Sequence, residues 1–217
     1  MVGRELSRLY PKEERKQGEP FFQVKNWSVV NPETGALVVN DVSFTLHRGE
    51  VLGIAGLMGA GRTELVMSLF GAYGKVIQGE IILEGQKVKI KTESDAIKAG
   101  LALVSEDRKR YGLVLEMQIK ENATLSSLDK ISTFGIIDTT KEIYHSNKFV
   151  DELKIKTPSV EQFAKNLSGG NQQKVVLSKW LMTNPKILIL DEPTRGIDVG
   201  AKFEIYTIIN QLLDSGV

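Results

Sequence analysis

The chain has 217 residues, of which 41% are hydrophobic and 25% charged, and its formal net charge is +1. These values are typical of a globular protein with a substantial core, and they give no indication of a nucleic-acid partner. The absence of cysteine excludes disulfides and thiolate metal sites, and two histidines are too few for a multi-histidine metal centre. No apolar run approaches the roughly 20 residues of a membrane-spanning helix, and the polar N-terminus does not resemble a signal peptide.

Residues 1–20 are predicted to form a linker, because they combine high charge density with Pro11, Gly18 and Pro20. Up to about residue 106, the pattern then predicts strands and short helices. The predicted elements are strands over 21–30, 36–49 and 50–56, a helix over 63–72, a hairpin over 79–90, a helix over 93–100 and a strand over 101–105. We expect the apolar segment 50–56, "EVLGIAG", to be a buried strand.

Residues 107–165 are mostly polar and are predicted to form a separate helical lobe. One of its helices carries an apolar face of Ile143, Phe149, Val150 and Leu153. In residues 166–217 the pattern returns to a turn, a helix, a fully buried strand over 187–190 and a helix from about 199. Buried strands that alternate with helices predict an α/β core around a parallel sheet, built from 21–106 and 166–217.

The segment "GLMGAGRT", residues 56–63, is similar to the phosphate-binding pattern G-x-x-x-x-G-K-[ST], with Arg62 in the lysine position. It lies between a predicted strand and a predicted helix, where free N–H groups and the helix dipole favour an anion. The alternative is a tight turn without a ligand. The hydroxyl of Thr63 is a candidate Mg²⁺ ligand. The candidate phosphate-binding residues are Gly56, Gly59, Ala60, Gly61, Arg62 and Thr63.

The apolar run 187–190 ends in Asp191 and Glu192. Carboxylates at the C-terminal end of a parallel strand project into the crevice where α/β proteins bind ligands. Asp191 is predicted to hold Mg²⁺, usually through water, and Glu192 to orient or deprotonate an attacking water. The alternative for this segment alone is a strand end with solvated acids, but the phosphate loop upstream favours the catalytic interpretation.

The segment "LSGGNQQK", residues 167–174, places Ser168, Gly169 and Gly170 before a predicted helix. Taken alone, it is either another anion-receptive helix N-terminus or an ordinary serine cap. The segment lies about 24 residues before Asp191, and in that position it closely resembles the LSGGQ signature of ATP-binding-cassette (ABC) ATPases. The order of phosphate loop, helical lobe, signature, acidic strand and "RGID" turn is also that of this family, over residues 21–217.

The resemblance implies a P-loop NTPase fold of the ABC type, with a parallel sheet core, an antiparallel β subdomain and an inserted α-helical lobe. It also implies a head-to-tail pair of cassettes, in which ATP and Mg²⁺ lie between the phosphate loop of one and the signature of the other. Asp198 falls at the position of the D-loop aspartate, which reaches across that interface. The signature residues expected to complete the partner's site are Ser168, Gly169, Gly170 and Asn171.

A narrower set of segments resembles the second cassette of the tandem ATPases that power monosaccharide importers. The segments are "GLMGAGRTEL", "SEDRKRYGLV", "LSGGNQQKV", "DEPTRGIDVGAK" and the linker-like "MVGREL". On this resemblance Met1 is an internal residue of a longer polypeptide. The implied partners are a first cassette, a membrane permease and, indirectly, a periplasmic or extracellular sugar-binding protein. The implied location is the cytoplasmic face of the membrane.

Some positions depart from the family's pattern. Arg62 is a wide planar fork where a compact lysine is usual, so we expect slow hydrolysis at this site. Glu106 stands where most cassettes carry a glutamine that contacts Mg²⁺ and water, and its carboxylate is a candidate metal ligand. The alternative to a functional role is that the segment "EDRKR" is a solvated charge run. Asn31 aligns near the adenine-stacking position, and nearby Trp27 is expected to pack in the core or on the surface, with stacking on adenine as the alternative.

The family's switch histidine is expected beyond Val217, so the strand that carries it is expected to be missing and a sheet edge exposed. Two other interpretations are a non-transport cassette of DNA repair or translation and a regulatory module without hydrolysis. The short helical lobe, without heptads or cysteines, disfavours the first. Glu192 argues against a complete loss of hydrolysis, and Arg62 argues for a partial one.

Overall fold

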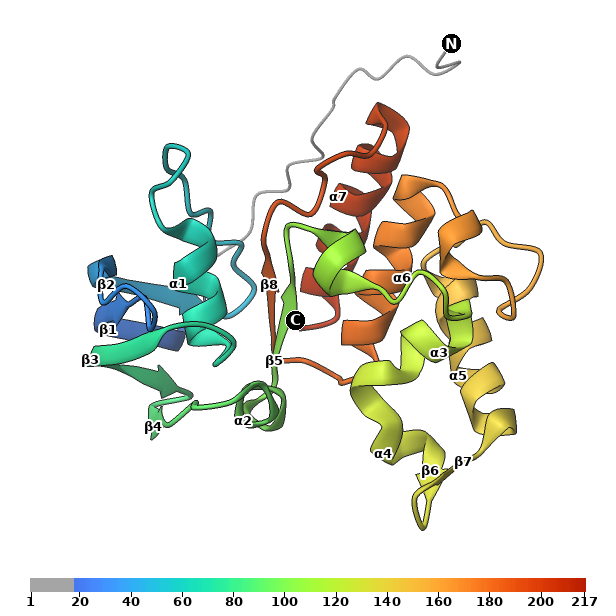
Figure 1. Cartoon of the computed structure of the whole chain (residues 1–217), viewed down its shortest axis with the longest axis horizontal. Helices are drawn as coiled ribbons and strands as arrows, with labels where there is room; N and C mark the ends of the chain where they lie inside the picture. The colour runs from blue at the N-terminus through green and yellow to red at the C-terminus, as the bar shows by residue number, and fades with distance from the viewer. Residues whose placement is uncertain (1–17) are drawn as a thin grey trace. The chain divides into compact units, whose positions relative to one another are not determined.

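The computed structural model describes residues 18–217, which divide into two compact units (Figure 1). The strand-rich unit comprises residues 18–103, 186–189 and 212–217, and the helical unit comprises residues 104–185 and 190–211. The predicted linker over residues 1–20 lies outside the described residues except for its last three.

An antiparallel sheet dominates the strand-rich unit, as predicted. Its strands have the order β2-β1-β3-β4 (Figure 1). The central strands bury side chains that include Val24, Val29 and Ile81, each at most 2% exposed, and register shifts interrupt the alternation along β1. The bounds are β1 Pro20–Val30, β2 Leu37–His47, β3 Lys75–Leu83 and β4 Gln86–Val88.

Two short helices and one strand of this unit were also predicted. Helix α1 (Arg62–Leu69) buries Leu65 and Leu69. Helix α2 (Glu93–Ala99) begins at a capping box between Thr92 and Asp95 and ends at Gly100, whose φ of 88° is the left-handed conformation that glycine adopts readily. The four residues of β5 (Leu101–Val104) that follow are all buried.

The prediction of a buried strand over residues 50–56 is wrong. Residues 51–57 have no assigned secondary structure, and Val51 and Leu57 are 62% and 85% exposed. A strand forms only where its N–H and C=O groups pair with a neighbouring strand. In the part of the chain that the structure describes, no strand pairs with this segment, so its apolar side chains stay in contact with solvent.

The strand β8 (Ile187–Leu190) pairs with β5 in a two-stranded sheet. The N–H groups of Ile187 and Asp191 donate to the carbonyls of Gly100 and Val104, at 3.1 and 2.9 Å. Since the partners advance in the same direction along both strands, the pairing is parallel, as predicted. Only Ile187 is fully buried, so the expectation of a fully buried strand is wrong for the other three residues. Among residues 18–217, no further strand lies beside them.

Helices form most of the helical unit, and α3 packs against α5 and α6. The centre of α6 is completely buried at Val175, Val176 and Leu177, and α7 buries Ile205 and Ile208. A hairpin of two-residue strands, β6 and β7, was not predicted. The bounds are η1 Arg108–Gly112, α3 Ile119–Thr124, η2 Leu125–Ser127, α4 Leu128–Ile131, β6 Ser132–Thr133, β7 Ile136–Ile137, α5 Thr139–Glu152, η3 Ala164–Asn166, α6 Gly169–Leu181 and α7 Val199–Asp214. Among residues 18–217, no helix is long and apolar enough to cross a bilayer.

Candidate functional site

The predicted phosphate loop leads into the N-terminus of α1 in the strand-rich unit. Gly59 and Gly61 have φ values of 80° and 79°, which a residue with a side chain adopts only at a cost. A Cβ atom at Gly61 would also lie 2.5 Å from the carbonyl oxygen of Val38. Both the backbone conformation and the close approach to β2 therefore require glycine immediately before the helix.

The side chain of Arg62 runs back along this loop. A Cβ atom placed on Gly56 would lie 3.5 Å from Cδ of Arg62 and 3.1 Å from Cβ of Ala60. Gly61 has no side chain with which to cap α1, whose first turn contains Thr63. A helix N-terminus of this kind, with an exposed loop around it, is suited to bind an anion.

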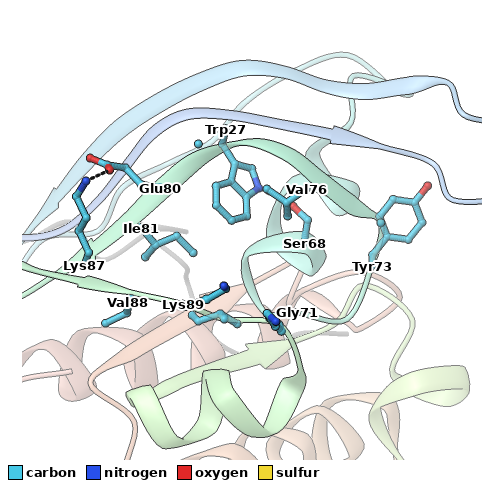
Figure 2. Close-up of a pocket in the computed structure, with 14 residues that line it drawn as sticks. Trp27, Ser68, Gly71, Tyr73, Val76, Glu80, Ile81, Lys87, Val88 and Lys89 are labelled. Atoms are coloured by element: carbon cyan, nitrogen blue, oxygen red, sulfur yellow. Dashed lines mark hydrogen bonds and ion pairs between the residues drawn. The ribbon is translucent and has the colours of Figure 1, made fainter.

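A pocket of about 530 Å³ lies at the opposite end of α1 (Figure 2). Its lining includes Trp27, Ser68 and Gly71, and Nε1 of Trp27 donates a hydrogen bond to Oγ of Ser68 at 3.0 Å. Because α1 rises about 1.5 Å per residue, Ser68 is separated from the phosphate loop by most of the helix. The prediction that Trp27 packs in the core is confirmed, since it is only 5% exposed.

The predicted catalytic and metal-binding carboxylates follow β8 in the helical unit. The N–H of Asp191 continues the pairing with β5, and Glu192 has a φ of 47°. This left-handed conformation is uncommon for a residue with a side chain and occurs at functional sites. The carbonyl of Glu192 accepts the N–H of Arg195 at 3.0 Å, which closes a turn after the strand.

Oxygen ligands are what Mg²⁺ prefers, and it commonly binds through one or two protein oxygens together with water and substrate phosphates. The hydroxyl of Thr63 and the carboxylate of Asp191 belong to that chemical class. Among residues 18–217, no three His, Cys, Asp or Glu residues lie close enough to hold a metal ion by themselves. Thr63 and Asp191 each supply an oxygen of the kind that binds Mg²⁺ together with water and phosphate.

The signature residues form the start of α6. Nδ2 of Asn171 donates to Oγ of Ser168 at 3.0 Å, and Oδ1 of Asn171 accepts the N–H of Lys156 at 2.9 Å. Ser168 occupies the N-cap position, but its side chain does not cap the helix. A Cβ atom on Gly170 would lie 2.5 Å from Cβ of Ala201, so this glycine allows α6 to pack closely against α7.

Asp198 caps α7. Its Oδ1 accepts the N–H of Ala201 at 2.9 Å, and its carbonyl accepts the N–H of Lys202 at 3.0 Å. Asp is a favourable residue at this position because its carboxylate satisfies N–H groups that have no partner within the helix. The expected D-loop aspartate therefore has a structural role within this chain.

Glu106 forms an ion pair with Arg195, and Arg108 lies nearby in the same unit. The guanidinium of Arg108 donates from Nη1 to the carbonyl of Arg195 at 2.8 Å and from Nη2 to that of Gly196 at 3.2 Å. Arg108 was not among the predicted site residues, because it lies within a charge run that is typical of a solvated surface. The sequence signal that could have identified Arg108 is its position two residues after Glu106, a predicted site residue.

The predicted site residues are thus distributed over both units. The phosphate-loop residues belong to the strand-rich unit. The helical unit contains Glu106, Asp191, Glu192, Asp198 and the signature, and there the structure brings Glu106 to the turn after the acidic strand.

A family model described as ABC transporter matches residues 39–195 of this chain. The match covers more than half of the sequence and includes the phosphate loop, the signature and the acidic strand. This chain belongs to the ABC transporter family. Solved ABC cassettes share its fold: the ATP-binding cassette MJ1267 has a TM-score of 0.77 at 22% identity, covering 92% of this chain and 79% of that chain. The cassette MJ0796, in a dimeric structure bound to ADP and Pi, has a TM-score of 0.74 at 18% identity, covering 89% and 83%.

Curated ABC transporter proteins also match the whole chain. The xylose import ATP-binding protein of Thermoanaerobacter pseudethanolicus is 58% identical over 218 residues, which cover 100% of this chain and 43% of that protein. The L-arabinose transport ATP-binding protein of Geobacillus stearothermophilus is 57% identical over 218 residues, covering 100% and 42%. The chain therefore spans less than half the length of these relatives.

Proposed function

We propose that this chain binds Mg-ATP at its phosphate loop and hydrolyses it slowly, as one cassette of an ATPase that energises monosaccharide import. The observation that carries the proposal is the left-handed glycine loop before α1, in the same chain as the Asp191–Glu192 strand end. Oriented N–H groups and the positive end of a helix dipole are what a polyphosphate requires. The carboxylates supply the metal and water chemistry that phosphoryl transfer needs.

Each residue has a proposed role. The phosphate-loop residues and Arg62 bind the phosphates, Thr63 and Asp191 hold Mg²⁺, and Glu192 orients or deprotonates the attacking water. The chemistry that Mg²⁺ would supply there is positive charge, which offsets the negative charge that develops on the phosphates. Glu106 is a weaker metal ligand in this proposal, because its carboxylate pairs with Arg195 and would have to exchange that partner to approach the nucleotide.

The slow rate follows from Arg62. Catalysis of phosphoryl transfer depends on positioning and electrostatics, and a guanidinium is wider and less flexible than an ammonium. The path of Arg62 beside Gly56 supports this argument, because its aliphatic part fills space within the loop. The signature, Ser168 to Asn171, would complete the site of a partner cassette in a head-to-tail pair, and that site would carry most of the turnover.

The proposed transported substrate is a pentose or related monosaccharide. Support comes from the relatives named for xylose import and L-arabinose transport, which match this chain over its full length. The proposed partners are a first cassette, a membrane permease and, through it, a periplasmic or extracellular sugar-binding protein. The proposed location is the cytoplasmic face of the membrane. Uptake of labelled xylose and L-arabinose by the complete transporter in vesicles would test the sugar.

Nucleotide binding and single-turnover hydrolysis by the purified chain test the ATPase. Wild type is expected to bind Mg-ATP and hydrolyse it slowly, and Arg62→Ala is expected to bind about tenfold or more weakly because a phosphate contact is lost. Glu192→Gln is expected to bind ATP normally and to lose hydrolysis. If wild type binds ATP and its site releases no phosphate even in the complete two-cassette ATPase, where a partner's signature completes it, the chain is a regulatory nucleotide-binding module instead.

The asymmetry has its own test in the complete two-cassette ATPase. Glu192→Gln in this cassette is expected to reduce steady-state hydrolysis much less than the same change in the partner cassette, because the partner's site is proposed to be faster. Equal losses from the two substitutions would refute the asymmetry while leaving ATP binding intact.

A further inference from the structure

Arg108 connects two segments that lie far from it in the sequence. Its Nη1 and Nη2 atoms donate to the carbonyls of Arg195 and Gly196, in the turn after the acidic strand. Its Nε atom donates to Oε1 of Gln172 at 3.4 Å, in the second turn of α6. We refer to these four residues, Arg108, Gln172, Arg195 and Gly196, as the Arg108 bridge. One guanidinium thus contacts both the turn that follows Glu192 and the helix that begins with the signature.

The bridge is exposed on the side of the turn and closely built on the side of α6. A Cβ atom on Gly169 would lie 2.8 Å from Nη2 of Arg108, so the first signature glycine leaves room for the guanidinium. Gln172 is only 5% exposed, and its Nε2 donates to the carbonyl of Ala164 at 3.1 Å. A buried amide with both ends bonded has one orientation, which fixes the acceptor that faces Arg108.

The backbone around Arg108 is also held at both ends. Arg108 begins η1, a single π-helical turn, and Oδ1 of Asp107 caps it by accepting the N–H groups of Lys109 and Arg110 at 3.0 and 3.1 Å. At the other end, Nζ of Lys179 donates to the carbonyl of Gly112 at 2.5 Å. These contacts hold the backbone from which the Arg108 side chain extends.

We infer that Arg108 is a positioning residue that couples the turn after Glu192 to the signature helix α6. The inference rests on the proposed function, because it assigns a role only if Glu192 and the signature act on ATP. If nucleotide binding shifts the turn at Arg195 and Gly196, two acceptors of the bridge move with it. Arg108 would pass this movement to its third acceptor, Gln172, on α6. Glu106 adds a second link to the same turn through its ion pair with Arg195.

Only arginine has the geometry that this role requires. Its donors lie in one rigid plane and can bond three acceptors in different directions, whereas the ammonium of lysine is a compact point charge on a flexible stem. Arg108→Lys keeps the charge and removes the planar fork. Arg110→Lys is the matched control two positions away, because the guanidinium of Arg110 lies over the ring of Tyr111, 5.1 Å from its centroid, and takes no part in the bridge.

The experiment follows amide hydrogen exchange of residues 169–174 in the full chain, with and without Mg-ATP, beside the dissociation constant for ATP. In wild type and Arg110→Lys, ATP is expected to slow exchange in these residues by about threefold or more, within the range of measured coupling energies. Arg108→Lys is expected to bind ATP within about twofold of wild type and to lose this response. A merely structural role would change exchange equally with and without ATP.

Gln172→Leu covers the case in which Arg108→Lys fails to fold, because it removes the contact to α6 and leaves both contacts to the turn. Like Arg108→Lys, it is expected to reduce the slowing of amide exchange in residues 169–174 by ATP. If a folded Arg108→Lys variant binds ATP and responds like wild type, the inference is overturned and the proposed function stands. If wild type binds no ATP, the proposed function is overturned, and the inference with it.

Discussion

Lys179 is an ammonium group buried within α6. It is 6% exposed, its Nζ donates to the carbonyl of Gly112, and it lies 5.2 Å from the ring centroid of Trp180. Burial lowers the pKa of Lys179 to about 8 from an ordinary value of 10.5, because removal from water penalises the charged form. The cost of burying this charge is therefore present at neutral pH and is relieved in alkaline solution.

The sign of the resulting pH dependence follows from proton binding. Between about pH 8 and the higher pKa of an unfolded lysine, the unfolded chain binds a proton that the folded chain does not. The free energy of unfolding contributed by Lys179 therefore rises with pH, by about 2 kcal/mol from pH 7.5 to 9.5. Urea unfolding at the two pH values measures this change. Lys179→Met, which has no charge to titrate, is expected to lack it, and parallel behaviour of the two proteins would contradict the assignment.

Close packing of the signature helix against α7 depends on Gly170. A Cβ atom on Gly170 would lie 2.5 Å from Cβ of Ala201, which is too close for two carbon atoms. The contact is therefore possible only because residue 170 has no side chain. Gly170→Ala is expected to destabilise the folded chain by about 1–3 kcal/mol, because the two helices would have to move apart. Chemical denaturation measures the loss.

Ala201→Gly supplies the matched control for that contact. The double variant should be more stable than the sum of the two single changes predicts, by about 0.5–3 kcal/mol of coupling. Additive effects would mean that the overlap between residues 170 and 201 is not the cause of the destabilisation.

The hairpin of β6 and β7 has a two-residue loop, Phe134 and Gly135, with φ values of 51° and 80°. Two left-handed residues form the type I′ turn, which favours Asn-Gly, whereas a bulky residue in this conformation is strained. Phe134 is also fully exposed, so it gains nothing from burial. Phe134→Asn is expected to raise the free energy of unfolding by about 1 kcal/mol.

Phe134→Leu is the control for this turn. It removes the aromatic ring but keeps an apolar side chain in the left-handed region, so a change near zero is expected in the same denaturation measurement. An equal gain from Phe134→Leu would attribute the effect to the lost ring instead of the relieved backbone.

Short-range signals allowed most elements to be predicted from the sequence. The β3–β4 hairpin follows from Glu84 and Gly85, and α2 follows from its capping residues and Gly100, all of which act on their own neighbours. Whether residues 50–56 form a strand, and whether the Arg108 bridge forms, depends on partners far away in the chain. The apolar pattern of 50–56 indicates only that a strand is suitable there, and it cannot supply the neighbour that forms the ladder.

On the scale of the whole molecule, residues 51–58 form an exposed apolar segment. Val51, Ile54, Leu57 and Met58 are 62%, 41%, 85% and 99% exposed, and none of residues 51–57 lies in a strand. An exposed apolar segment that pairs with no strand among residues 18–217 is available to pair with another chain. We therefore expect the purified 217-residue chain to self-associate as its concentration rises, with residues 51–57 becoming protected from amide exchange in the associated form.

Ile54→Lys tests whether this segment is responsible. A charge there should oppose intermolecular pairing and shift the sedimentation profile toward the monomer. Tyr144→Lys is the control, because Tyr144 is 68% exposed on α5, where the backbone is already bonded within a helix. Association driven by apolar area in general would respond to both substitutions, whereas strand pairing responds to Ile54→Lys alone. A wild-type chain that stays monomeric at all concentrations would show that exposure of residues 51–57 does not lead to pairing.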